Sequence, residues 1–158
     1  VLDDLLPGKN LYMLATGTGL APFLSLTRDP EVYERFDKVI LVHGVRHVED
    51  LAYRKMFEED LPNDEIFGDW VREKFIYYPT VTRDEFKNQG RVTDLLKSGK
   101  LFQDIDMPPI NKDDDRVMIC GSMAMNADTC AILDEFGLTI SPRMGEPADY
   151  VVERAFVG

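Results

Sequence analysis

The chain has 158 residues, and its 44% hydrophobic content is enough for the core of one ordinary domain. Lys and Arg total 18 against 29 Asp and Glu, so the net charge of −11 argues against nucleic acid or an anionic membrane as the main partner. No apolar run approaches the roughly 20 residues that would cross a bilayer. With two cysteines and two histidines we expect no metal site, no disulfide scaffold and a cytoplasmic location.

Strands and helices are predicted to alternate along the chain. Short apolar runs predict strands at 10–15, 38–44, 75–78, 116–120 and 150–156. Amphipathic or glycine-bounded segments predict helices at 21–27, 31–36, 49–61, from 92 onward, and at 123–136. This order predicts an α/β, Rossmann-like fold in which a mainly parallel sheet is flanked by helices on both faces. We expect residues 1–158 to form one domain, because no linker or repeat divides them.

A glycine-rich turn follows the first predicted strand. Pro22 suits the first turn of the helix that follows, because the N–H that proline lacks would be unpaired there. Glycines let a phosphate approach bare backbone, and a helix N-terminus supplies free N–H groups. The same glycines also suit a turn that needs them for geometry alone. The candidate phosphate-binding residues are Thr16, Gly17, Thr18, Gly19, Ala21 and Pro22.

Basic residues follow the second and third predicted strands. In parallel sheets, ligands bind outside the carboxyl ends of the strands, where Arg46, Thr82 and Arg83 are expected, with Arg91 before the next helix. Two arginines and a hydroxyl could hold a phosphate monoester, and arginine favours the 2′-phosphate of NADP where an acid favours NAD. The alternatives are that Arg83 pairs with Asp84 or Glu85 on the surface, and that Arg46 is a solvated loop residue.

The fourth predicted strand is also followed by a glycine and a helix. Gly121 would let the chain turn close to a ligand, and Ser122 could cap the helix that starts at Met123. Cys120, at the tip of the strand, could contact a planar ring or could be a small buried apolar residue. Phe156, close to the end of the sequence, could fill the core or could form a movable lid over a flat cofactor.

Five segments, in this order, resemble bacterial ferredoxin/flavodoxin–NADP⁺ reductases. They are ATGTGLAPF, VILVHGVRHVEDLAYR, TVTRDEFKNQGRVTDLL, CGSMAMN and YVVERAFVG. The resemblance covers essentially the whole chain and implies the NADP(H)-binding domain of an FAD flavoenzyme, with the flavin-binding barrel outside these residues. It implies the chain's own FAD-binding domain and ferredoxin or flavodoxin as partners, a monomer, and no turnover without the flavin domain.

The resemblance also implies roles for single residues. Residues 16–22 would face the pyrophosphate and the nicotinamide, and residues 121–123 would contribute to cofactor binding. Cys120 would lie beside the nicotinamide as a catalytic residue, and Phe156 would stack on the isoalloxazine ring and yield to the nicotinamide. The 2′-phosphate and adenosine would be held by Arg46, Thr82, Arg83 and Arg91.

Three other functions compete with this one. An NADH-using reductase of the same superfamily would place an acid or a neutral residue where Thr82, Arg83 and Arg91 stand. A noncatalytic NADP-binding regulatory module would need neither Cys120 at a strand tip nor Phe156 over a flavin. In a structural α/β domain without a ligand, arginines at the strand ends would be accidental.

Overall fold

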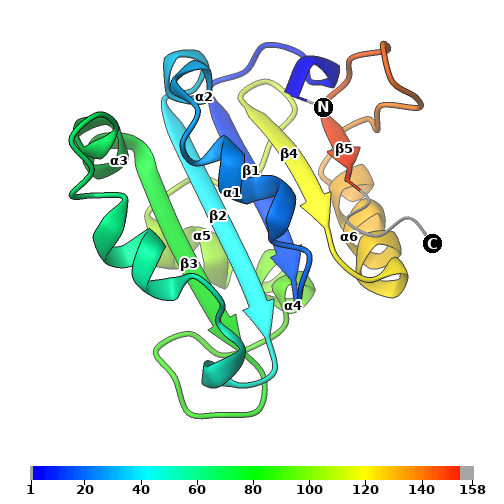
Figure 1. Ribbon diagram of the computed structural model, residues 1–158. Coiled ribbons are helices and arrows are strands. Elements are labelled where there is room, and N and C mark those ends of the chain that lie inside the picture. The colour runs from blue at the N-terminus through cyan, green and yellow to red at the C-terminus, as the bar shows by residue number, and fades with distance from the viewer. Residues whose placement is uncertain (1, 154–158) are drawn as a thin grey trace.

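The computed structural model describes residues 2–153, which contain one five-stranded sheet. Its strand order is β3-β2-β1-β4-β5, and every pair of neighbours is parallel. In Figure 1 the strands run side by side and point the same way. The strands are β1 (Asn10–Thr16), β2 (Lys38–Val45), β3 (Phe75–Val81), β4 (Asp115–Cys120) and β5 (Tyr150–Val152). The predicted α/β fold with a parallel sheet is confirmed.

Helices cover both faces of the sheet because successive strand residues point to opposite sides. In β1, Leu11 and Met13 pack with α1 (Ala21–Leu26), α2 (Pro30–Arg35) and α3 (Gly68–Lys74). Tyr12 and Leu14 pack on the opposite face. The helices there are α4 (Val92–Ser98), α5 (Lys100–Ile105) and α6 (Met123–Glu135). In residues 2–153, no helix is long and apolar enough to span a membrane.

The strand order reverses beside β1. From β1 the chain moves outward to β2 and β3, then crosses back to β4 on the other side of β1 and continues to β5. A crevice opens where the connections diverge in this way, outside the carboxyl ends of β1 and β4. The strand order alone therefore predicts a ligand site at the carboxyl ends of β1 and β4.

The structure corrects the helix predicted at 49–61. That segment holds a 3₁₀ turn, η2 (Val48–Asp50), and a π-helical turn, η3 (Met56–Asp60). Tyr53, between them, has a φ of 62°, which a right-handed helix cannot contain. The sequence analysis also missed α3 and α5, which are only seven and six residues long.

The third strand is longer than predicted. It runs through Pro79 to Val81, although the sequence analysis ended it before the proline. Proline cannot donate a ladder hydrogen bond, but β3 is an edge strand with one neighbour, where proline is tolerated. Of the last predicted strand, Tyr150–Val152 is observed, and its remainder from 154 lies outside the described residues.

A buried arginine holds the opposite, amino-terminal edge of the sheet together. The guanidinium of Arg116 donates to the carbonyls of Leu6 (3.1 Å), Pro7 (2.8 Å) and Lys112 (2.7 Å). It also lies 3.5 Å from a carboxylate oxygen of Asp149, and both side chains are almost fully buried. This cluster joins the segment before β1 to β4 and to the start of β5.

Replacing Arg116 with methionine should lower the free energy of unfolding by roughly 3–5 kcal/mol, because it leaves the Asp149 carboxylate buried without its counter-charge. Urea denaturation measures the loss. The double variant Arg116→Met/Asp149→Asn should be more stable than Arg116→Met alone, because it removes that uncompensated charge. A single variant as stable as the parent chain would contradict this account of the cluster.

Candidate functional site

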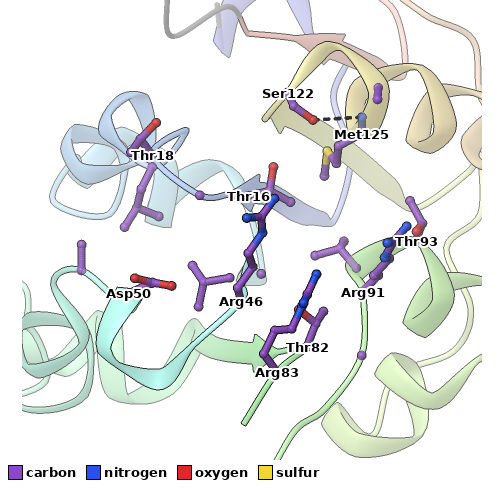
Figure 2. A pocket seen from close by; sticks show the side chains of 18 of the residues that line it. Thr16, Thr18, Arg46, Asp50, Thr82, Arg83, Arg91, Thr93, Ser122 and Met125 are labelled. Atoms are coloured by element: carbon purple, nitrogen blue, oxygen red, sulfur yellow. Dashed lines mark hydrogen bonds between the residues drawn. The ribbon is translucent and has the colours of Figure 1, made fainter.

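An open cavity of about 1160 Å³ lies at the carboxyl edge of the sheet. Its walls come from the segments that follow β1, β2 and β3 and from the first turns of α4 and α6. Figure 2 shows these segments around the cavity, with polar side chains directed into it. Segments that are far apart in the sequence therefore meet at the edge that the strand order marks as a ligand site.

The turn between β1 and α1 forms one wall. Gly17 has a φ of 55°, its N–H donates to the carbonyl of Gly44 at 3.0 Å, and its carbonyl accepts from Nε2 of His43 at 2.9 Å. A Cβ added at Gly17 would meet nothing within 4 Å. Glycine is thus required here by the backbone conformation, and the space above it is open to a ligand. Thr16, Thr18 and Ala21 line the cavity beside it.

The second glycine of the turn has a packing role. A Cβ added at Gly19 would collide with the backbone carbonyl of Cys120, so this glycine lets the start of α1 approach the end of β4. Pro22 occupies the first turn of α1 as predicted, but it lines a separate groove of about 360 Å³ together with Glu153. Neither Gly19 nor Pro22 lines the large cavity.

Three arginines project into the cavity. Arg46, Arg83 and Arg91 are exposed and line it together with Thr82, and Figure 2 shows their side chains extending inward. Among residues 2–153, none of the three guanidinium groups has a hydrogen-bonding or ion-pair partner. The alternative pairing of Arg83 with Asp84 or Glu85 is not observed. The cavity therefore presents three guanidinium groups that no described carboxylate pairs with, although Asp50, Asp94 and Asp128 also line it.

The first turn of α6 forms the facing wall. Ser122 caps this helix as predicted: its Oγ accepts from the Met125 N–H at 3.2 Å. Ser122 and Met125 line the cavity, whereas Met123 is 90% exposed and does not line it. Gly121 is required by packing, because an added Cβ would collide with the Thr16 hydroxyl. The free N–H groups of a 13-residue helix thus face the cavity near the β1–α1 turn.

Several wall residues escaped the sequence analysis. They come from helix interiors or from a segment predicted as helix, where no motif marked them, although nearness to a strand end would have suggested some of them. Asp50 accepts from the His47 N–H at 3.1 Å and so caps η2. Among the missed wall residues are Leu24, Asp50, Tyr53, Thr93, Asp94, Met125 and Asp128.

The two residues predicted to be catalytic lie apart from the cavity or outside the described structure. Cys120 is completely buried, within the apolar cluster that contains Phe23 and Met118, and it does not line the cavity. Its place beside a nicotinamide stays a prediction. Phe156 lies outside the described residues. Within 2–153, no group of three or more His, Cys, Asp or Glu residues could hold a metal ion.

A buried histidine is hydrogen-bonded to the glycine turn. His43 is completely buried in β2, and Nε2 donates to the Gly17 carbonyl, which can only accept. Nδ1 is buried without a hydrogen-bond partner, so the ring is neutral. Burial lowers the pKa of His43 below its usual value and outweighs the Gly17 hydrogen bond, which raises it.

Comparison with known proteins agrees with this geometry. The model of the oxidoreductase NAD-binding domain matches residues 13–131. The chain belongs to this family. It is 68% identical over 157 residues to the ferredoxin–NADP reductase of Azotobacter vinelandii and 66% identical to that of Pseudomonas aeruginosa. Each match covers 99% of this chain, which spans 61% of the length of either relative.

A solved structure gives the same result. The ferredoxin NADP⁺ reductase from Neisseria gonorrhoeae with bound FAD and NADP aligns with 99% of this chain and 60% of its own, at 30% identity and a TM-score of 0.84. The resemblance to ferredoxin/flavodoxin–NADP⁺ reductases is confirmed. This member of the oxidoreductase NAD-binding domain family thus carries its cavity where the Rossmann-like fold predicts a dinucleotide.

The buried neutral His43 should make the protein less stable in mild acid. Well above pH 6.5 the residue is neutral in both the folded and the unfolded chain. Between pH 6.5 and the lower folded pKa, only the unfolded chain takes up the proton, so the free energy of unfolding falls as pH falls. Urea denaturation between about pH 5 and 8 measures this dependence. His43→Gln should flatten it, and identical slopes in both proteins would contradict the assignment.

Proposed function

We propose that the chain is the NADP(H)-binding part of a flavin-dependent oxidoreductase that exchanges electrons between NADPH, FAD and ferredoxin or flavodoxin. One observation carries the dinucleotide assignment. Three unpaired arginines and the Thr82 hydroxyl surround an open cavity whose wall includes the bare backbone of Gly17. Exposed guanidinium groups without an ion-pair partner favour the binding of a multiply charged anion, because no protein partner has to be displaced first.

The arrangement of charges favours a 2′-phosphorylated dinucleotide. Thr82 and Arg83 follow β3, and Arg91 precedes α4, so all three can converge on one phosphate. An NADH-using reductase would present an acid to the ribose hydroxyl. The acid next to Arg83, Asp84, has both carboxylate oxygens engaged by His47 and Val48. We therefore propose NADP(H) rather than NAD(H) as the cofactor.

The rest of the dinucleotide would cross the carboxyl edge of the sheet. We propose that the pyrophosphate lies over the turn of Thr16, Gly17 and Thr18, near the capped start of α6, and that Arg46 contributes to the 2′-phosphate side together with Arg83. Gly19, Pro22 and Gly121 would support this site indirectly, since packing explains the two glycines and Pro22 faces another groove. Met123 does not line the cavity, and its contact with the cofactor stays a prediction.

The flavin would be held mainly by the part of the longer relatives that this chain does not span. A bound flavin supplies hydride and single-electron chemistry, whereas this chain would bind the dinucleotide and place its reactive ring. Contact of Cys120 with the nicotinamide, and of Phe156 with the flavin, belong to this proposal. So do a single domain over residues 1–158, a monomeric state and a cytoplasmic location.

Arg83→Ala should weaken NADP⁺ binding by roughly 1.5–3 kcal/mol, the usual contribution of a hydrogen bond to a charged group. Its affinity for NAD⁺ should be unchanged, because NAD⁺ lacks the 2′-phosphate. Isothermal titration of this chain with both dinucleotides measures the difference.

Arg143→Ala is the matched control for Arg83→Ala, because it removes the same charge outside the cavity, where Arg143 pairs with Glu146 at 3.3 Å. The control should bind NADP⁺ as the parent chain does. Equal affinity of the parent chain for NADP⁺ and NAD⁺ would refute the 2′-phosphate assignment, and so would equal losses in the two variants.

A further inference from the structure

The segments that follow β2 and β3 are joined beyond the ends of the two strands. The N–H of Thr82 donates to the carbonyl of Val45 at 3.1 Å, and the N–H of Arg83 donates to the carbonyl of Arg46 at 2.8 Å. These two bonds lie just past Val45 and Val81, the last paired residues of β2 and β3. Backbone pairing brings the two arginine-bearing segments side by side.

A carboxylate closes this junction. Oδ2 of Asp84 accepts from the N–H of Val48 at 2.8 Å, and Oδ1 accepts from Nδ1 of His47 at 3.1 Å. These two hydrogen bonds, that of Val48 first, hold the pKa of Asp84 below its usual value. We call these contacts between Asp84, His47 and Val48 the Asp84 clasp.

The Asp84 clasp adjoins the arginines on both sides. Arg46 directly precedes His47, and Arg83 directly precedes Asp84, so the clasp fixes the two backbone positions from which these guanidinium groups project. It also turns the Asp84 carboxylate toward His47 and Val48. The carboxylate therefore does not neutralise Arg83, whose guanidinium stays without a partner among the described residues.

We propose that Asp84 is a positioning residue for phosphate recognition. By clasping the two segments it holds Arg46 and Arg83 at the same side of the cavity, and it thereby sets the preference for a 2′-phosphorylated dinucleotide. The inference rests on the proposed function, because it requires the arginines to bind the cofactor. Asp84 acts through the loop backbone and does not touch the cofactor itself.

Charge and position predict opposite effects of removing this carboxylate. If Asp84 acted only through its charge, Asp84→Asn would raise the affinity for NADP⁺, because a negative charge near two arginines disappears. If it acts through the clasp, Asp84→Ala weakens NADP⁺ binding although the site becomes more positive. Glu85→Gln is the matched control, since Glu85 is exposed and has no partner among the described side chains.

The experiment is isothermal titration of this chain and its variants with NADP⁺ and NAD⁺, well below their melting temperatures. We expect Asp84→Ala to lose about tenfold in NADP⁺ affinity, the scale of one misplaced contact to a charged group, with NAD⁺ affinity changed less than about twofold. Glu85→Gln should bind NADP⁺ at least as well as the parent chain. A gain in NADP⁺ affinity in Asp84→Ala, or a parallel loss for both dinucleotides, would overturn the proposal.

Substitution of His47, the histidine of the Asp84 clasp, tests the proposal independently of Asp84 itself. His47→Ala leaves the charge of Asp84 in place and should reproduce the selective loss of NADP⁺ affinity, and Asp84→Ala should cost less when added to it than it does alone. If Asp84→Ala does not fold, His47→Ala alone tests the proposal, and unchanged NADP⁺ affinity in it would overturn the clasp. Additive losses in the double variant would overturn it as well. Equal binding of both dinucleotides by the parent chain would instead refute the proposed function on which the inference rests.

Discussion

The parallel pairing of β1 with both of its neighbours is the constraint on which the site depends. Thr16 is paired with Gly44 of β2, and Ala15 with Cys120 of β4, so three strands end at the same level of the sheet. The glycine turn begins between those ends, where the Gly44 carbonyl and the His43 ring hold Gly17 in its left-handed conformation. A shift of one residue in either pairing would direct β1 side chains to the wrong face and displace the turn from its supports.

Much of the fold could be predicted from the sequence, because buried parallel strands are uninterrupted apolar runs. All five strands were found, and the carboxyl ends of the first four carried the candidate residues. The errors arose where tertiary context outweighs local pattern. The charged and apolar residues of 49–61 suit a helix, but Tyr53 takes a φ of 62° within it. Pro79 ends a strand in isolation, yet the edge position of β3 requires no donor from it.

The candidate site was predictable in its chemistry and less so in its detail. The arginines were found because cations are scarce in this acidic chain and follow strand ends. That Asp84 would turn to the neighbouring loop and leave Arg83 unpaired depends on a contact between two separate loops, which no local pattern encodes. Side-chain alternation explains the buried position of Cys120: it shares its face of β4 with Met118, inside the core.

The central claim is that the chain recognises a 2′-phosphate at the ends of β2 and β3. The most direct test follows backbone amide NMR shifts in this chain during parallel titrations with 2′-phospho-AMP and AMP. The account predicts that Thr82, Arg83 and Arg91 shift strongly with 2′-phospho-AMP and only weakly with AMP. Identical shifts with both nucleotides, or shifts confined to the groove lined by Pro22 and Glu153, would contradict it.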